Sequence, residues 1–262
     1  MNESIIQAAM QSADFMTAEL AFKEMDTELL LLTDASDQAS LLLRKAHLYG
    51  ILQKFVEARR EISLALTTAP SDTDIRFQSE HLDALLYHEE QDVEEAFKRM
   101  TALLSEHFQR MKLPEARPVY EDIQVRRGFE LVQLLRFEEA VPIFKECLSF
   151  YLESEDRAEV LADLGICYSH LKRYEEARDC FLQAREVGLL ERTQGRVHVQ
   201  FGIVYFHLNL LRESKQEFQL AEREPNESQF PMKSVYGWLA AVCRRLGEKI
   251  ESEEYARLAN PS

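Results

Sequence analysis

Small and large apolar residues alternate along this chain in a pattern that returns at a nearly constant interval. The first markers of the pattern are six small residues separated by 38, 44, 37, 37 and 38 positions: Ala46, Ala84, Gly128, Gly165, Gly202 and Ala240. A second marker always follows twelve positions later: Ala58, Ala96, Ala140, Ala177, Ser214 and Ser252. The distance from one first marker to the next therefore varies, whereas the distance from a first marker to its second marker is constant. This predicts pairs of helices joined by a turn of fixed length.

Larger apolar residues keep the same phase. Three positions after the first marker stand Tyr49, Tyr87, Leu131, Tyr168, Tyr205 and Cys243. Four positions after the second marker stand Ile62, Met100, Phe144, Phe181, Phe218 and Ala256. Spacings of three and four place these side chains on the marker face of each helix. We expect the small residues to let helix backbones approach closely while the large ones fill the space beside them.

One repeat shows the full motif most clearly. It reads Leu164-Gly165-x-x-Tyr168, then Leu171-Lys172-Arg173-Tyr174-Glu175-Glu176-Ala177, then Phe181 and Ala184. This pattern resembles the tetratricopeptide repeat, from residue 39 to about 260. The resemblance implies an all-α fold, a right-handed α-solenoid of six to seven stacked antiparallel helical hairpins. We expect repeats at 39–72, 77–111, 119–156, 158–190, 195–228 and 233–260, in one continuous solenoid after a degenerate hairpin over residues 1–36.

Two departures from the family pattern stand out. The usual interval between markers here is longer than the repeat length of 34 that is typical of the family. The longest interval contains Pro114 and Pro118, which stop a helix and favour an extended connection. We therefore predict a loop over residues 111–118.

Composition and charge narrow the functional classes. The 262 residues include only 8 Gly and 7 Pro, which favours helix almost throughout. The net charge of −15 disfavours binding to nucleic acid or to an anionic membrane. The chain has neither a signal-like N-terminus nor an apolar run of membrane-spanning length, so we expect a cytoplasmic protein. The four cysteines form no CxxC pair, and we interpret them as reduced core thiols.

No catalytic motif is evident. A phosphate-binding loop, HExxH, GxSxG and an acidic calcium loop are all missing, so we expect no enzyme and no cofactor. Adjacent glutamates such as Glu138 and Glu139 lie in the first turn of a second helix, where the helix dipole favours negative charge. His88, His170 and His207 hold similar places in their repeats, which raises a metal site as an alternative. Without an HxxxH pair, solvated or peptide-contacting histidines are the favoured interpretation.

The family resemblance implies a concave groove lined by the first helix of each hairpin. The candidate partner-binding residues are Arg44, His47, Leu85, His88, Arg126, Phe129, Asp163, His170, Arg196, Ile203, His207, Trp238, Arg244 and Arg245. The full set of groove positions also includes Glu89, Asp122 and Glu159, so it holds five arginines and four carboxylates, and we expect the groove to be less negative than the rest of the surface. Trp238, the only tryptophan, is either a groove anchor or a core residue between helices.

These features predict a non-catalytic scaffold or adaptor that binds a peptide or protein segment. The two-carboxylate clamp of chaperone-binding relatives is not expected, because Leu43 and His47 replace its first Lys and Asn. A peptide-sensing regulator is one alternative, although residues 1–35 are too short for the effector domain of such relatives. A homodimer through the last repeat is another, since Ile250, Tyr255 and Leu258 would leave an apolar edge.

Overall fold

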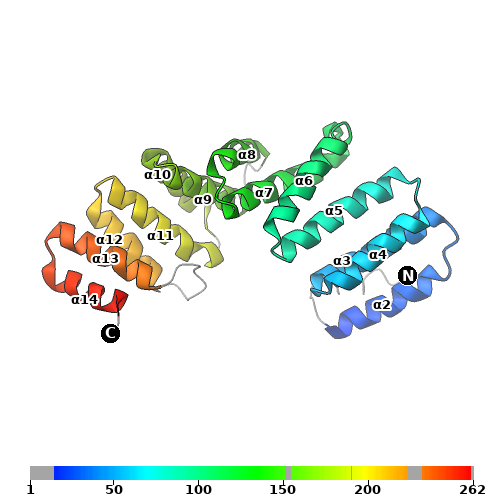
Figure 1. Ribbon diagram of the computed structural model, residues 1–262, viewed down its shortest axis with the longest axis horizontal. Coiled ribbons are helices and arrows are strands. Elements are labelled where there is room, and N and C mark those ends of the chain that lie inside the picture. Colours follow the sequence, from blue (N-terminus) through cyan, green and yellow to red (C-terminus); the bar gives the residue numbers. More distant parts are fainter. Residues whose placement is uncertain (1–14, 151–154, 190, 224–231, 261–262) are drawn as a thin grey trace. The chain divides into compact units, whose positions relative to one another are not determined.

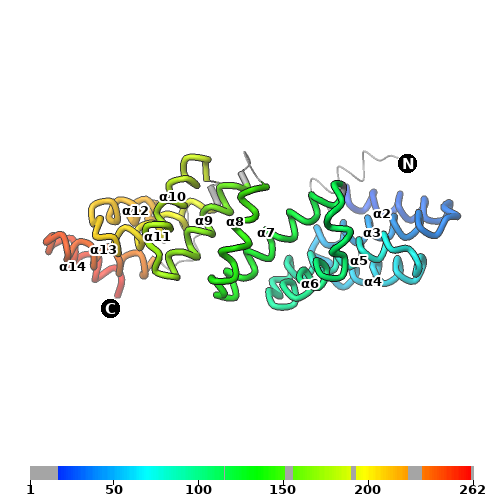
Figure 2. The backbone as a smooth tube through the Cα atoms, turned by 90° about the horizontal axis from the view of Figure 1, so that it is seen from above, coloured from blue at the N-terminus to red at the C-terminus, as the bar shows by residue number. Residues whose placement is uncertain are grey.

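The computed structural model describes residues 15–150, 155–189, 191–223 and 232–260. These residues form helices joined by short turns, and no β-strand occurs among them (Figure 1). The chain divides into two compact units, unit 1 (Met1–Tyr120) and unit 2 (Glu121–Ser262). Within each unit, neighbouring helices lie side by side as antiparallel hairpins (Figures 1 and 2). The predicted all-α fold of stacked hairpins is thereby confirmed.

Unit 1 contains two complete hairpins. Its helices are α2 (Phe15–Leu29), α3 (Ala35–Ile51), α4 (Phe55–Thr68), α5 (Thr73–Glu89) and α6 (Val93–Glu106). Two short 3₁₀ turns follow, η1 (Arg110–Lys112) and η2 (Pro114–Ala116), where the sequence predicts a loop. The first helix of the degenerate hairpin predicted over residues 1–36 lies outside the described residues.

Unit 2 repeats the hairpin four times. Its helices are α7 (Arg117–Gln133), α8 (Phe137–Phe150), α9 (Glu155–His170), α10 (Tyr174–Val187), α11 (Glu191–His207), α12 (Leu211–Arg223), α13 (Met232–Leu246) and α14 (Lys249–Ala259). The boundary between the units falls in the first turn of α7. The first helices α9, α11 and α13 contact one another in sequence, and the second helices pack against them.

The same turn joins the two helices of every hairpin. The residue seven positions after each first marker has a left-handed backbone, with φ of 57°, 61°, 57°, 60°, 62° and 83° at Gln53, Gln91, Leu135, Lys172, Asn209 and Gly247. The next N–H bonds back to the carbonyl five positions earlier, as from Arg173 to Tyr168 at 2.8 Å. This Schellman arrangement stops the first helix at a set point. It explains why the spacing between first and second markers never changes.

The markers show how the two helices of a hairpin meet. A Cβ added to Gly165 would lie 2.8 Å from the ring of Phe181, and one added to Gly202 would lie 2.8 Å from Phe218. Both rings are fully buried. In unit 1 the residues opposite are smaller in cross-section, Ile62 and Met100, and there the markers are alanines. The phenylalanine ring therefore fills the space that a marker side chain would need.

Small polar residues serve as second markers in the last two repeats. The Ser214 hydroxyl donates a hydrogen bond to the Gly202 carbonyl at 2.7 Å, and Ser252 does the same to Ala240 at 3.0 Å. Each bond crosses the hairpin between the two marker positions. A buried serine is tolerated there because its hydroxyl has a partner.

The cysteines are core residues, as the sequence predicts. Cys147, Cys167, Cys180 and Cys243 are free thiols and all four are buried. Burial raises the pKa of the first three to about 12 and that of Cys243 to about 11. Thiols with such pKa values stay protonated at neutral pH and are poor nucleophiles.

Candidate functional site on the first helices

The candidate residues of unit 1 lie on two adjacent first helices. Arg44 and His47 are on α3, and Leu85 and His88 are on α5. His47 is exposed, and the other three are half-buried. Helices α3 and α5 contact each other, so these four residues belong to one layer of the unit.

On α7, the candidate side chains are already engaged within unit 2. The Arg126 guanidinium donates to Asp122, one turn earlier, at 3.0 and 3.1 Å. The ring of Phe129 packs against Phe144 with centroids 5.6 Å apart. Arg126 therefore contributes less positive charge to the surface than the sequence alone indicates.

Arg196 and Asp163 form an ion pair between consecutive hairpins. Arg196 on α11 donates two hydrogen bonds to the Asp163 carboxylate on α9, at 2.8 and 3.1 Å. Asp163 is only 2% exposed. Burial raises the pKa of this carboxyl group, and the nearby guanidinium offsets part of that effect. This ion pair links α9 to α11. The sequence pattern does not reveal this structural role.

Two candidate histidines stack on the preceding hairpin. The His170 ring lies on Phe137, 4.2 Å between centroids and 6° from parallel. The His207 ring lies on Tyr174 in the same way, at 4.5 Å and 5°. Both histidines remain exposed on their other sides. Partial burial lowers the pKa of each, and the charges of Arg245 and Lys172 lower the pKa of His207 further.

An aromatic cluster surrounds the only tryptophan. We define the Trp238 cluster as Phe206, His207, Phe218, Trp238 and Arg245. The Trp238 ring stacks on the buried Phe218 at 6.0 Å and meets Phe206 edge-on at 5.3 Å. The Arg245 guanidinium covers Phe206 at 4.6 Å. Trp238 and Phe206 are half-buried, so Trp238 belongs partly to the core and partly to the surface. Ile203 packs against the same apolar core.

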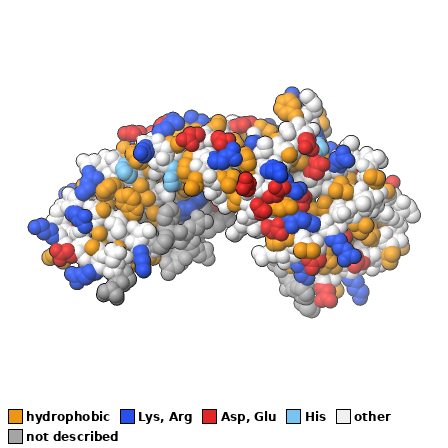
Figure 3. Space-filling model, in the orientation of Figure 1, with side chains coloured by type: hydrophobic (Ala, Val, Ile, Leu, Met, Phe, Trp, Pro, Cys, Tyr) orange, Lys and Arg blue, Asp and Glu red, His pale blue; other side chains and the backbone are white. Residues whose placement is uncertain are grey.

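The surface around this cluster carries uncompensated positive charge. Lys172 and Arg244 are exposed and form no ion pair within the described residues. Arg245 donates to neutral acceptors, the Asn209 side-chain oxygen at 2.7 Å and the Phe206 carbonyl at 3.4 Å. In Figure 3, apolar side chains gather over α11 and α13 with histidine and basic side chains beside them. This is the most basic and aromatic part of the candidate set.

Several expectations concern other chemistry. His88, His170 and His207 belong to no cluster of metal-ligating side chains among the described residues. Cys243, Glu248 and Glu251 do lie together, but the Lys215 ammonium sits between the two carboxylates at 2.8 and 2.5 Å. Self-association through α14 stays a prediction: Ile250 and Leu258 are exposed there, while Tyr255 stacks on Tyr236.

The sequence pattern does not reveal several aromatic residues that contact the candidate side chains. It gives no role to Phe206, nor to the aromatic residue that opens a second helix, Phe137 or Tyr174. A signal is present in the segments 134–140 and 171–177, which both read Leu-x-Arg-aromatic-Glu-Glu-Ala. Their aromatic residues, Phe137 and Tyr174, precede the histidine of the next repeat by the same distance. These contacts join residues about one repeat apart in sequence and on different hairpins. The spacing of residues along a single helix therefore does not reveal them.

Comparison with known proteins agrees with this architecture. Residues 120–188 match the tetratricopeptide repeat family. A signal transduction ATPase of the STAND class with a tetratricopeptide repeat sensor, from Pyrococcus horikoshii, superposes with a TM-score of 0.73 at 17% identity, over 98% of this chain and 41% of that one. A tetratricopeptide repeat protein from Parabacteroides merdae gives 0.57 at 16% identity, over 98% and 91%. YrrB, a tetratricopeptide repeat protein with an unusual peptide-binding site, gives 0.53 at 16% identity, over 70% and 84%.

The chain therefore has the fold of tetratricopeptide-repeat proteins, and residues 120–188 carry that repeat in sequence. This fold is generally a scaffold for protein–protein interaction. No curated protein sequence matches the chain. Within the described residues, every helix is too short or too polar to cross a bilayer.

Proposed function

We propose that this protein is a non-catalytic scaffold that binds a segment of a partner protein along α9, α11 and α13. The Trp238 cluster is the observation that carries the proposal. Its rings are held by buried neighbours and yet remain partly exposed, so they lose little freedom on binding. Tryptophan and arginine are also enriched among the interface residues that contribute most of the binding energy.

The charges around the cluster indicate the chemistry of the partner. Among the described residues, Lys172, Arg244 and Arg245 lie without carboxylate partners, in a chain of net charge −15. A segment with an aromatic or aliphatic anchor next to acidic residues would match this surface, since complementary charge speeds encounter and fixes register. The peptide-binding site described for YrrB, a protein of the same fold, supports a peptide as the ligand class.

The remaining candidates have supporting roles. Asp163 and Arg196 hold α9 against α11 and thereby set the spacing of the binding surface. His170 holds α9 on the preceding hairpin, and His207, which also belongs to the Trp238 cluster, holds α11 in the same way. Under this proposal, the candidates of unit 1 contribute secondary contacts at most.

Selection of peptides from a random displayed library tests the proposal directly. Peptides enriched on the purified protein are synthesised, and their affinity is measured by fluorescence polarisation. We expect acidic peptides with an apolar anchor, and a loss of affinity of at least about tenfold in Trp238→Ala and in the double variant Arg244→Glu with Arg245→Glu. Arg257→Ala, an exposed change on the second helix α14, is the matched control and leaves affinity unchanged.

Two results would contradict the proposal. One is a set of selected peptides that bind the charge-reversal variant as tightly as the wild type. The other is a loss in Trp238→Ala that is accompanied by loss of helical circular dichroism, with full affinity retained in Trp238→Phe and in the charge-reversal variant.

A further inference from the structure

A pocket in unit 1 is separate from the surface proposed above. It measures about 440 Å³ and lies between α4, α5 and α6. Its lining combines apolar side chains such as Ile62 and Leu103 with charged residues at both ends. Pockets of this size hold small ligands or ions in many proteins.

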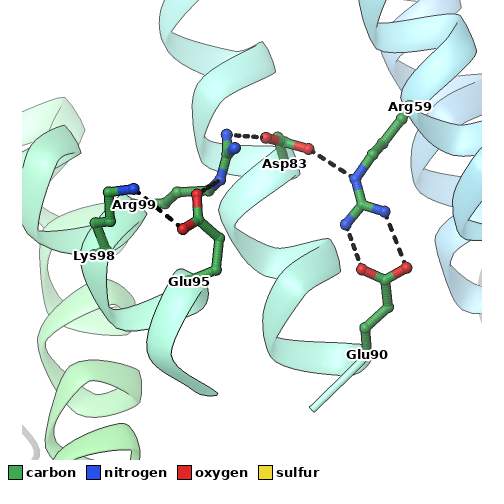
Figure 4. Close-up of polar contacts among 6 residues, drawn as sticks. All are labelled: Arg59, Asp83, Glu90, Glu95, Lys98 and Arg99. Atoms are coloured by element: carbon green, nitrogen blue, oxygen red, sulfur yellow. Dashed lines mark hydrogen bonds and ion pairs between the residues drawn. The ribbon is translucent and has the colours of Figure 1, made fainter. Parts of the chain in front are cut away.

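One end of the pocket is neutralised internally. Arg59 from α4 pairs with Glu90 and, at 3.2 Å, with Asp83 of α5 (Figure 4). Arg99 from α6 pairs with Asp83 on the other side and with Glu95 at 2.9 Å. The two guanidinium groups also lie 4.1 and 4.4 Å from the centre of the Tyr87 ring. Each of these charges therefore has a partner within the unit.

The other end is acidic. Glu80 from α5 and Glu106, the last residue of α6, both line the pocket. Neither carboxylate pairs with a lysine or arginine among the described residues. His107 follows Glu106, and its Nε2 lies 2.8 Å from Glu80 Oε2. One ligand atom from each of the three side chains lies within 4.8 Å of the others.

A buried hydroxyl in the same pocket is also unsatisfied. Ser79 is 1% exposed and lines the pocket beside Glu80, and its Oγ has no hydrogen-bond partner in the part of the chain that the structure describes. An unsatisfied buried hydroxyl costs about 1–3 kcal/mol. The pocket thus presents an unsatisfied hydroxyl and two carboxylates without a lysine or arginine partner, and the His107 imidazole lies beside Glu80. A bound cation would neutralise both carboxylates.

We propose that Glu80, Glu106 and His107 bind a zinc ion. Zinc accepts imidazole nitrogen and carboxylate oxygen in tetrahedral sites, where bonds of about 2.0–2.2 Å hold the ligand atoms roughly 3.5 Å apart. The three ligand atoms here lie within 4.8 Å of one another. Three protein ligands leave a fourth position for water, and the unsatisfied Ser79 hydroxyl lines the same pocket as the two carboxylates. Calcium requires six to eight oxygen ligands, which this set does not supply. His107 is held for the role by an edge-on contact with Phe77, at 5.0 Å.

The ion would link the N-terminal part of α5 to the C-terminal end of α6, within one hairpin. Glu80 lies in the second turn of α5, and the other two ligands close α6, so a bound ion joins the two helices of one hairpin. A ligand that binds only the folded state stabilises it in proportion to the logarithm of its concentration. Zinc would therefore stabilise unit 1, independently of peptide binding by unit 2.

Zinc titration of the full chain after chelator treatment tests this site. We expect one zinc per chain by calorimetry and a higher melting temperature in the presence of zinc. Glu106→Gln and His107→Gln each weaken binding at least about tenfold and abolish the thermal shift, while Glu94→Gln, an exposed change on α6, leaves both unchanged. Glu251→Gln changes the second group of metal-ligating side chains, Cys243, Glu248 and Glu251, whose carboxylates pair with Lys215. We expect zinc binding to be unchanged in this variant as well.

Cobalt provides a second readout that stability does not affect. Cobalt bound in place of zinc gives a visible absorption band, which we expect to disappear in His107→Gln. Absence of binding at micromolar zinc in the wild type would overturn the proposal, and so would zinc binding of wild-type strength in the double variant Glu106→Gln with His107→Gln. Circular dichroism of the metal-free variants separates lost ligands from lost fold.

Discussion

At the scale of single residues, the first three hairpins of unit 2 depend on glycine at positions where alanine would clash. Gly128, Gly165 and Gly202 each face a buried phenylalanine ring at a distance that leaves no room for Cβ. The ring of Phe181 cannot move aside freely, because it also packs against Phe201 at 5.3 Å. Overpacking of this kind usually costs about 1–3 kcal/mol.

Replacement of Gly165 by alanine should therefore destabilise the protein, although alanine is the better helix former. We expect a loss of about 1–3 kcal/mol in the free energy of unfolding, measured by urea denaturation. Gly237→Ala is the matched control, because Gly237 lies inside α13 and a Cβ added there meets no described atom within 4 Å. That variant should gain about 0.5–1 kcal/mol. Equal effects of the two substitutions would contradict the packing account.

The residue scale also shows where sequence reasoning stops. The sequence predicts that Arg196 anchors a partner, but in the structure it neutralises Asp163 on the neighbouring hairpin. The two residues lie far apart in sequence and occupy different columns of the repeat. A comparison of equivalent positions therefore does not bring them together. The marker columns, by contrast, report packing inside one hairpin and are readable directly.

At the scale of elements, consecutive hairpins are joined by a repeated side-chain contact. The residue five positions after the first marker reaches back to the preceding hairpin: His170 stacks on Phe137, His207 stacks on Tyr174, and Arg245 bonds to Asn209. The contact persists while the chemistry changes from imidazole to guanidinium. The first helices α9, α11 and α13 are thus fixed at their C-terminal ends as well as along their length.

The histidine stacks make stability dependent on pH. Both histidines have a folded-state pKa below their ordinary value of 6.5, so the unfolded chain binds protons that the folded chain does not. Their contribution is complete above pH 6.5 and is lost as the pH falls through that value toward the folded-state pKa. We expect the unfolding free energy to decline between about pH 7 and pH 5.

The double variant His170→Phe with His207→Phe keeps aromatic stacking and removes this titration. Its unfolding free energy, measured by urea denaturation across the same pH range, should show a smaller decline than that of the wild type. Carboxylates with lowered pKa, such as Glu139 and Glu176, titrate below their ordinary value of 4.5 and so act in a lower pH window. Parallel pH curves for the variant and the wild type would contradict this assignment.

The helices themselves were predictable because the marker spacing records them. The structure places every first marker in a first helix and every second marker in a second helix, from α3 to α14. The helix starts were harder to predict, since α11 begins at Glu191 whereas the sequence places the start of that repeat at residue 195. The first turn of a helix carries few buried residues, so periodicity defines it weakly.

At the scale of the whole molecule, each hairpin is stabilised mainly by contacts within itself and with its neighbours in sequence. Within each unit, a described helix packs mainly against the other helix of its own hairpin and, beyond that, against the hairpins next to it in sequence. Stability in such repeat proteins is approximately a sum of the terms for single repeats and for their interfaces with neighbours. A defect in one hairpin should therefore loosen its surroundings without reaching distant repeats.

Hydrogen exchange measured by mass spectrometry tests this localisation. In Gly165→Ala, we expect faster exchange of amides in α9 and α10 and, to a smaller extent, in α8 and α11. Amides of α3 and α4 in unit 1 should exchange at the wild-type rate. A uniform increase in exchange along the chain would mean that the protein unfolds as one cooperative body instead.

The candidate zinc site illustrates the limit of prediction at this scale. Glu80 and His107 lie on different elements and far apart in sequence, and they do not hold equivalent positions of successive repeats. The hairpin formed by α5 and α6 brings these residues together, but no short motif records it. The Trp238 cluster was only half predictable for a related reason, since Phe206 and Trp238 approach one another across two hairpins.

The pairing of glycine with phenylalanine also restricts how these repeats can change over time. A hairpin with the Gly165–Phe181 contact can reach the alanine and isoleucine arrangement of Ala46 and Ile62 by two substitutions. If the ring is reduced first, the intermediate has a cavity. If the methyl group is added first, the intermediate has a steric clash. The two orders pass through different destabilised intermediates. The order in which the two substitutions occur therefore determines the kind of packing defect that the repeat must tolerate.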